Sequence, residues 1–343
     1  MNTPNHIPAE KFQTALLGWY ARGHRAMPWR DENASPYHIW LAEVMLQQTT
    51  VTAVIPYYQR FLHRFPTLQS LAEAPIDDVL QHWQGLGYYR RAHMLHKCAQ
   101  TLMRDHNGQF PVTEAELLNL PGLGPYTAAV IAATAFNTAA NVVDGNVERV
   151  ISRLYRVQQE LPAARTTLRN LADHLASPAE PRLYANAIME LGSQVCTPTT
   201  PQCLLCPVAQ WCEANQHGDQ TTYPRKAPKK QTPHHTATAW LITDASGHIY
   251  LQQRPATGLL ASLYELPHSG WEPKSTPQQA PLMLETQTEC GSITHVFSHF
   301  KLTLNLLHTE VTNIPAANRF HPEALPALST LMRKALTHAL KQT

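Results

Sequence analysis

Residues 120–127 read LPGLGPYT, and the alanine-rich run AAVIAATAF follows directly at 128–136. Two glycines and two prolines within five residues break any helix, whereas the run after them has the composition of a buried one. Gly122 and Gly124 allow the backbone to approach a ligand closely, and amides at a helix N-terminus suit a phosphate. The stretch predicts a helical hairpin at about 113–136. An ordinary helix–helix turn stays open as the alternative.

The bulk composition predicts a globular protein of two domains. The chain has 343 residues, 43% of them hydrophobic and 15% charged. It starts without a signal pattern and has no apolar stretch of membrane-spanning length, so we expect a soluble cytoplasmic protein. Residues 1–212 carry 14 Arg and 2 Lys against 16 acidic residues. This balance lacks the basic excess of many DNA-binding proteins, so any case for DNA depends on local features.

The hydrophobic pattern changes near residue 212. Apolar residues recur at helical spacing before it, whereas 213–235 is polar, contains three prolines and reads as a basic linker. Beyond the linker, 237–254 predicts two short strands joined by a turn, 291–311 alternates as strands do, and 322–340 predicts a helix. We therefore expect an all-α domain at 1–212 and a small α+β domain at 236–343.

Four of the six cysteines lie close together, with the spacing C-x6-C-x2-C-x5-C. In a chain without a leader, such clustering favours metal binding over disulfides. One C-x2-C pair with two flanking cysteines suits an iron–sulfur cube better than structural zinc, which stays open as the alternative. Cys98 and Cys290 stand alone and read as structural thiols. The predicted cluster ligands are Cys196, Cys203, Cys206 and Cys212.

Six sequence blocks together resemble one family. They are MPWR at 27–30, EVMLQQT at 43–49, GLGYYRRA at 85–92, LPGLGPYT at 120–127, VVDGNVERV at 142–150 and GLLASLYELP at 258–267. With the cysteine loop, they resemble the helix-hairpin-helix DNA glycosylases that carry a four-iron–four-sulfur (4Fe-4S) cluster, and most closely the MutY adenine DNA glycosylases. The resemblance implies a helical glycosylase domain with a cluster loop at 196–212, and a MutT-like (Nudix-fold) domain after the linker.

Two carboxyl groups are candidates for the chemistry. Glu43 is flanked by apolar residues, and such surroundings keep a carboxyl protonated to higher pH, as a general acid requires. A glutamate on the polar face of a helix is the alternative. Asp144 opens DGNVERV, where aspartate favours a helix N-cap. The resemblance implies that Glu43 protonates adenine, that Asp144 stabilises the sugar cation, and that Asn146 is a neighbouring active-site residue.

Tyr126 distinguishes two types of glycosylase. Relatives that also cut the strand resemble this hairpin but carry lysine at its position, which forms a Schiff base with the sugar. Residues 1–212 contain only Lys11 and Lys97, and neither lies in a motif. A phenol cannot form an imine, so the sequence predicts a monofunctional glycosylase.

Several further residues are expected to contact DNA or the excised base. Leu86, Gly87 and Tyr88 lie on a predicted tight turn and can form an exposed wedge that fills the gap left by a flipped nucleotide. Arg90 and Arg91 beside them would hold phosphates. By resemblance, Gln48 and Thr49, on the same predicted helix as Glu43, reach into the duplex. The predicted adenine pocket comprises Arg25, Trp29, Arg30 and Asn186, the last being a departure from the Gln or Glu usual in the family.

The second domain is expected to recognise DNA rather than to hydrolyse nucleotides. Residues 272–290 lack the glutamate-rich metal helix of active Nudix hydrolases. By resemblance, Phe297, Ser298 and His299 read 8-oxoguanine, although a strand followed by a turn would explain the same letters.

The sequence thus predicts a monomeric enzyme that excises adenine mispaired with 8-oxoguanine or guanine in double-stranded DNA, acting at the nucleoid of a bacterium. Two alternatives stay open. One is a bifunctional glycosylase/lyase similar to endonuclease III, and the other is a non-catalytic DNA-binding protein with structural zinc.

Overall fold

The computed structural model describes residues 7–31, 34–228, 232–271 and 286–343. The chain divides into two units, one made of Met1–Ile55, Thr67–Gln69 and Lys97–Lys229, and the other of Pro56–Pro66, Ser70–His96 and Lys230–Thr343. This division groups part of the helical segment with the C-terminal residues. The domain boundaries at 212 and 236 stay a prediction.

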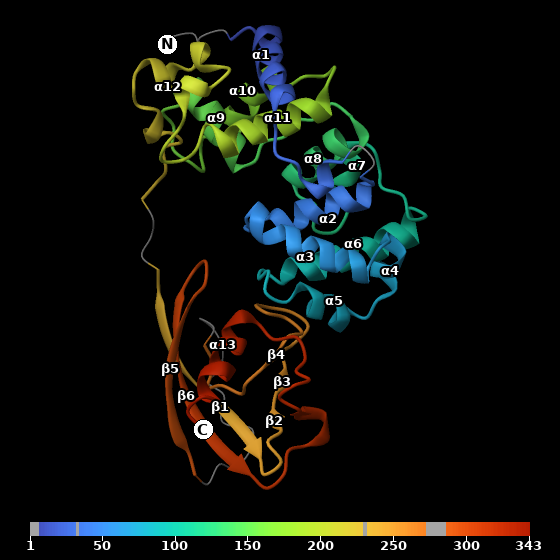
Figure 1. Cartoon of the computed structure of the whole chain (residues 1–343), viewed down its shortest axis with the longest axis vertical. Helices are drawn as coiled ribbons and strands as arrows, with labels where there is room; N and C mark the ends of the chain where they lie inside the picture. Colours follow the sequence, from blue (N-terminus) through green and yellow to red (C-terminus); the bar gives the residue numbers. More distant parts are fainter. Residues whose placement is uncertain (1–6, 32–33, 229–231, 272–285) are drawn as a thin grey trace. The chain divides into compact units, whose positions relative to one another are not determined.

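Helices make up most of the described residues before 212 (Figure 1). No helix in the described ranges has the length and apolar character needed to cross a membrane. The longer helices are α1 (Ala9–Arg22), α2 (Pro36–Leu46), α3 (Val51–Arg64), α4 (Leu68–Glu73), α5 (Ile76–Trp83), α6 (Arg90–Asp105), α8 (Pro125–Phe136), α9 (Gly145–Leu154), α10 (Arg165–Leu175) and α11 (Pro181–Gln194). The short ones are α7 (Glu114–Leu117), α12 (Glu213–Gln216), and 3₁₀ turns at Pro28–Arg30, Cys203–Leu205, Ala209–Trp211 and Gln220–Thr222.

The predicted hairpin is present as α7, a turn and α8. Thr113 caps α7, since its hydroxyl accepts from the Glu116 N–H. Gly122 has a φ of +78°, which glycine adopts without strain, and Pro125 starts α8 at the position where proline costs no hydrogen bond. Residues 127–134 of α8 are all buried, and the helix contacts α2, α7 and α11. The alanine-rich run therefore forms a helix at the centre of the first unit.

A second core in the first unit joins α1, α9, α10 and α11. Its buried residues recur at helical spacing, for example Val147, Val150, Ile151 and Leu154 on α9. This packing places the N-terminal end of α9, which carries Asp144, beside α11.

The beginning of the expected linker is folded. Tyr223 is buried, and its carbonyl accepts from Arg153 Nε at 3.1 Å. Arg156 pairs with Asp219 at 2.7 Å, and Leu161 pairs with Lys226 in a β-bridge. Residues 213–228 thus pack on the first unit, which polar composition alone did not predict.

The C-terminal residues form the predicted α+β arrangement. A five-stranded sheet has the order β5-β6-β1-β2-β7, with β1 parallel to β6 and its other pairs antiparallel. Helix α13 packs on β5 and β6, as Figure 1 shows. The elements are β1 (His234–Asp244), β2 (Ile249–Tyr250), β5 (Thr288–Val296), β6 (Lys301–Val311), β7 (Arg319–Phe320), α13 (Thr330–Ala339), a 3₁₀ turn at Ala316–Asn318, and a second small sheet of β3 (Gln252–Gln253) and β4 (Tyr264–Glu265).

Candidate active site

The centre of the candidate site is a buried carboxyl on α2. Residues 39–45 of this helix are all buried, Glu43 among them, with 7% of its surface exposed. Burial raises the pKa of Glu43 to about 7, although the hydrogen bond from Tyr126 and the charge of Arg30 act in the opposite direction. Glu43 therefore keeps its proton up to a pH of about 7. The polar-face alternative for this residue is wrong.

Tyr126 is the hydrogen-bond partner of that carboxyl. As the second residue of α8, it points its hydroxyl at Glu43 Oε2, 2.8 Å away. Burial and the charges of Glu43 and Asp144 raise the pKa of Tyr126 well above its ordinary value. The phenol therefore stays protonated and donates. It orients the carboxyl and supplies no amine.

Asp144 is held as the N-cap of α9. Its Oδ1 accepts from the Val147 N–H at 2.7 Å, and its Oδ2 accepts from Asn146 Nδ2 at 2.7 Å. Burial raises the pKa of Asp144, and these hydrogen bonds oppose the rise. The charge of Asp144 also raises the pKa of Glu43. The structure thus brings the two predicted carboxyls into one electrostatic environment.

Arg149 links this site to the cysteine loop, and the sequence did not single it out. It donates to Asn146 Oδ1 at 2.9 Å and to the carbonyls of Gly192 and Cys196, each at 2.7 Å. A Cβ on Gly192 would lie 2.6 Å from the Cβ of Asn146, so only glycine allows this approach of α9 and α11. A glycine in the last turn of α11 was the available sequence signal.

Two predicted pocket residues, Arg25 and Arg30, meet on a carboxylate that the sequence did not reveal. Glu190 is almost fully buried and accepts from Arg25 Nε at 2.6 Å, from Arg25 Nη2 at 2.9 Å and from Arg30 Nη1 at 2.9 Å. Burial raises the pKa of Glu190, but hydrogen bonds from both arginines outweigh it and hold the pKa below its ordinary value. Trp29 is buried, and Asn186 lies half-buried on α11.

Gln48 and Thr49 do not lie on the same helix as Glu43, contrary to the prediction. Helix α2 ends at Leu46, and Gln48 is exposed in the following turn with a φ of +62°. Thr49 donates its N–H to the Leu46 carbonyl at 3.2 Å. The helix ends where the apolar run ends, at Leu46, and polar residues follow it.

The predicted wedge turn belongs to the second unit, and only one of its two side chains is exposed. Tyr88 is 50% exposed with a φ of +47°, whereas Leu86 is 7% exposed. Arg91 is buried and donates to the carbonyls of Leu86 and Gly87, each at 3.2 Å. Arg91 therefore fixes the turn rather than offering itself to phosphates, while Arg90 is exposed. The turn presents Tyr88.

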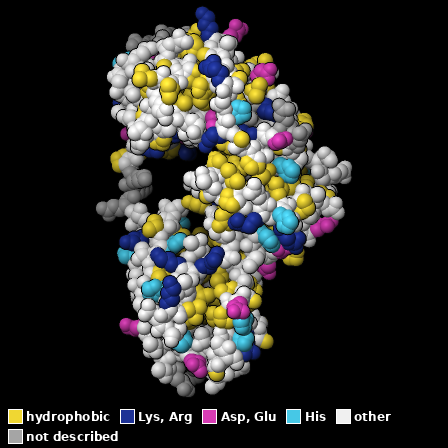
Figure 2. Space-filling view, viewed as in Figure 1, with side chains coloured by type: hydrophobic (Ala, Val, Ile, Leu, Met, Phe, Trp, Pro, Cys, Tyr) yellow, Lys and Arg dark blue, Asp and Glu magenta, His cyan; other side chains and the backbone are white. Residues whose placement is uncertain are grey.

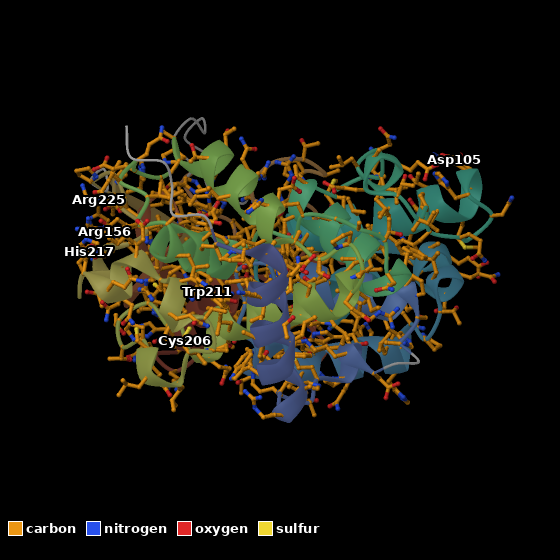
Figure 3. The ribbon with its side chains drawn as sticks, turned by 90° about the horizontal axis from the view of Figure 1, so that it is seen from above. Asp105, Arg156, Cys206, Trp211, His217 and Arg225 are labelled. Atoms are coloured by element: carbon orange, nitrogen blue, oxygen red, sulfur yellow. The ribbon has the colours of Figure 1, made fainter. Side chains whose placement is uncertain are left out.

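The four cysteines of the 196–212 loop line one cavity, together with Arg153 and uncharged residues. Arg153 is buried, donates to Cys196 Sγ at 3.3 Å and to the Thr197 carbonyl at 2.7 Å. Burial raises the pKa of Cys206 to about 12 and that of Cys212 to about 11. Figure 3 shows Cys206 and Trp211 at the end of the first unit that also carries Arg156, His217 and Arg225, with Asp105 at the opposite end.

In the second unit, residues 297–299 form the turn between β5 and β6. The Phe297 ring stacks between Trp271 and Phe300, with centroids 5.3 and 4.4 Å away. Ser298 and His299 are exposed, and Ser298 Oγ lies 3.2 Å from His299 Nδ1. Residues 272–290, which the sequence predicts to lack the metal helix of active Nudix hydrolases, lie for the most part outside the described residues.

On the face of the molecule seen in Figure 2, basic side chains form no continuous patch. Figure 2 shows Lys and Arg in small groups separated by uncharged surface on the face in view. This face thus shows no basic excess, in agreement with the balanced charge of the sequence. Contacts with a polyanion therefore depend on individual groups.

Comparison with known proteins identifies the class. A family model described as HhH-GPD superfamily base excision DNA repair protein matches residues 41–176, and a NUDIX domain model matches residues 238–338. A thermostable thymine-DNA glycosylase aligns with a TM-score of 0.56 and 26% identity, covering 61% of this chain and 97% of that one. An endonuclease III–DNA complex shares the fold, with a TM-score of 0.53 and 24% identity over 62% of this chain and 99% of that one. The chain is a DNA N-glycosylase of base excision repair.

Closer relatives define the particular family. The chain is 34% identical to an adenine DNA glycosylase of Homo sapiens, covering 94% of this chain and 73% of the relative. It is 40% identical to an adenine DNA glycosylase of Mycobacterium tuberculosis, covering 61% of this chain and 68% of the relative. The chain belongs to the adenine DNA glycosylase family, as the sequence motifs predicted.

Neutralising Glu190 should destabilise the fold. Glu190→Gln leaves Arg25 and Arg30 without their carboxylate, which we expect to lower the free energy of unfolding by roughly 3 kcal/mol. Urea unfolding followed by circular dichroism measures the change. The control is Glu180→Gln, which removes the same charge from the exposed residue before α11. Equal unfolding midpoints for the two variants would contradict the structural role of Glu190.

Proposed function

We propose that this enzyme removes adenine paired with 8-oxoguanine or guanine from double-stranded DNA, by hydrolysis of the N-glycosidic bond and without cutting the strand. The observation that carries this proposal is the hydrogen bond from Tyr126 to the buried Glu43, a carboxyl whose pKa burial raises to about 7. Tyr126, which donates this bond, stands where the relatives that cut the strand carry lysine, and it orients the Glu43 carboxyl that we propose as the proton donor.

The proposed reaction starts with the adenine flipped out of the helix. Glu43 donates its proton to a ring nitrogen of the base, and the C1′–N9 bond breaks with its electron pair going to the base. The sugar is left as an oxocarbenium-like cation. The Asp144 carboxylate, held by the Val147 N–H and Asn146, stabilises this cation until water adds at C1′ and loses a proton.

The geometry also favours a monofunctional enzyme. Tyr126 donates to Glu43 with a phenol whose pKa is raised well above its ordinary value by burial, so it is not a nucleophile at neutral pH. Lys11 lies exposed on α1, and Lys97 lies exposed on α6. No residue that we place beside Glu43 can form the imine that strand cleavage requires.

Contacts with the duplex are proposed for backbone positions at two helix starts. Gly124 caps α8 with an ordinary φ of −93°, and Gly145 starts α9. A Cβ added to either glycine would meet no protein atom within 4 Å. Neither backbone strain nor packing therefore explains glycine at these positions, whereas close approach of a phosphate does. We propose that Gln48, Thr49 and Tyr88 contact the same duplex, with one protein molecule acting on it.

The cysteine loop is proposed to hold a four-iron–four-sulfur cluster. Among the described residues, no group of three or more His, Cys, Asp or Glu side chains is placed to hold a single metal ion. The four thiols instead surround a common cavity, and Arg153 points a positive charge at Cys196 Sγ. Ligation would cross-link the loop through Cys196, Cys203, Cys206 and Cys212, and the proposed base excision passes through none of them.

Two measurements test the proposed reaction: the rate of base excision, and strand breakage with and without alkali. With adenine opposite 8-oxoguanine, the wild-type product should appear as a broken strand only after alkali. Glu43→Gln should lower the single-turnover rate by two to four orders of magnitude, roughly the share of a general acid. The wild-type rate should fall as the pH rises through about 7, since only protonated Glu43 is active. Strand breaks without alkali, or near-normal excision by the variant, would reject the proposed chemistry.

Iron content tests the cluster. Cys203→Ser should lose iron and destabilise the loop after residue 196, because a cluster site folds with its metal. Atomic absorption and the visible spectrum of the purified protein measure this loss. Cys98→Ser, at a buried thiol remote from the loop in sequence, is the matched control. Full iron content in Cys203→Ser, or stoichiometric zinc in the wild type, would rule out the assignment.

The Ser298 hydroxyl tests the recognition of the opposite base. Ser298→Ala should reduce the preference for 8-oxoguanine over guanine by about 1–3 kcal/mol, as expected for a lost base contact. The preference is measured as the ratio of single-turnover excision rates on the two duplexes. Ser246→Ala, in the turn between β1 and β2, is the control. An unchanged ratio in Ser298→Ala would assign recognition to other residues.

A further inference from the structure

The turn that presents Tyr88 is tied to the C-terminal part of the chain by the next residue. Tyr89 is 3% exposed, and its hydroxyl accepts from the Gly85 N–H at 3.3 Å. The same hydroxyl donates to the Leu328 carbonyl, also at 3.3 Å. Burial raises the pKa of Tyr89, which keeps the donor protonated. One hydroxyl therefore joins the start of the turn to the residue that precedes the N-cap of α13.

A second bond repeats this link one helical turn further along. Tyr89 directly precedes α6, and the His93 N–H donates to its carbonyl at 3.2 Å, so the two side chains lie on the same side of the helix start. His93 Nε2 lies 3.0 Å from the Ala261 carbonyl. Because a carbonyl only accepts, Nε2 carries the hydrogen. Both bonds end on main-chain carbonyls of the C-terminal residues, whose positions do not vary with side-chain rotamers.

The turn itself is rigid. Gly85 has a φ of +102°, and a Cβ there would lie 2.1 Å from the Tyr57 hydroxyl. Trp83 Nε1 donates to the Gly87 carbonyl at 3.2 Å, as Arg91 also does. With its carbonyls held in this way, the turn moves as one body, and a shift at Tyr89 displaces Tyr88.

On the other side, Leu328 is connected to the turn that contains Ser298. Leu328 pairs with Tyr264 in a β-bridge, and the Tyr264 N–H donates to the Ala327 carbonyl at 2.9 Å. Helix α13, which starts two residues after Leu328, packs on β5 and β6, the strands that flank 297–299. A continuous set of packed and hydrogen-bonded groups thus runs from 297–299 to Tyr88.

We propose that Tyr89 and His93 are positioning residues for specificity, which hold the Tyr88 turn in register with the part of the chain that reads the opposite base. This inference rests on the proposed roles of Tyr88 as the wedge and of 297–299 as the reader. Binding of 8-oxoguanine at 297–299 then fixes α13 and Leu328, and through Tyr89 it fixes Tyr88 in its inserted position. Guanine, which is bound more weakly there, leaves the wedge less often in place.

The test compares rates on the two duplexes in the full-length protein. Tyr89→Phe and His93→Leu should each lower the ratio of excision opposite 8-oxoguanine to excision opposite guanine by about three- to tenfold, the factor of one lost hydrogen bond. His93→Gln, which keeps an N–H donor, should restore most of the ratio. Tyr250→Phe, which removes a buried hydroxyl on β2 away from the turn, should keep the wild-type ratio. Fluorescence of 2-aminopurine at the target position reports the flipping step.

Two further variants separate this inference from the proposed function. If Tyr88→Ala leaves both rates unchanged and Ser298→Ala leaves the ratio unchanged, the wedge and the reader are wrong, and the coupling fails with them. If those variants behave as proposed but Tyr89→Phe and His93→Leu keep the wild-type ratio, only the coupling is wrong. Equal loss on both duplexes, with a lower melting temperature, would show that Tyr89 and His93 serve stability alone and would also overturn the inference.

Discussion

The site depends on one constraint, the burial of a carboxyl without a counter-charge in direct contact. Glu43 lies within an apolar helix and receives one neutral hydrogen bond, from Tyr126. A cation in contact would stabilise the carboxylate and hold the pKa low. Arg30 could do so, but its Nη1 instead donates to Glu190 Oε2 at 2.9 Å. The charge of Arg30 still lowers the pKa of Glu43, but burial outweighs this effect.

Helix α9 transmits position from the cysteine loop to the second carboxyl. Asp144, Asn146, Arg149 and Arg153 lie along it at spacings of two to four residues, so their side chains can connect successive turns. Arg149 joins Asn146 to the Cys196 carbonyl, and Arg153 binds Cys196 Sγ and the Thr197 carbonyl. Both guanidiniums are anchored on main-chain oxygens. Loss of order in the loop would therefore reach Asp144 through the hydrogen bonds that link Arg149, Asn146 and Asp144.

The sequence predicted the elements whose cause is local. The hairpin follows from Gly122 and Pro125, the N-cap follows from Asp144, and the cysteine set follows from spacing. It did not predict features that depend on a distant partner. Arg91 reads as a surface charge, yet it is buried because the carbonyls of Leu86 and Gly87 need a donor. In the sequence nothing distinguishes Glu190 from other acidic residues, because its partners Arg25 and Arg30 lie 165 and 160 positions away. The same limit applies to Tyr223, since composition does not show that its carbonyl meets Arg153.

Balanced charge and DNA binding are compatible because the groups that meet phosphates need not be lysines. Helices α8 and α9 each begin at a position with open space above the backbone, beside Tyr126 and Asp144 respectively. The free N–H groups of a helix start attract an anion through their partial charges without adding a titratable cation. A lysine in the same place would lower the pKa of the nearby Glu43 and remove its proton at neutral pH. Backbone amides avoid that conflict, so the proposed DNA-binding surface can adjoin the carboxyl that we propose as the proton donor.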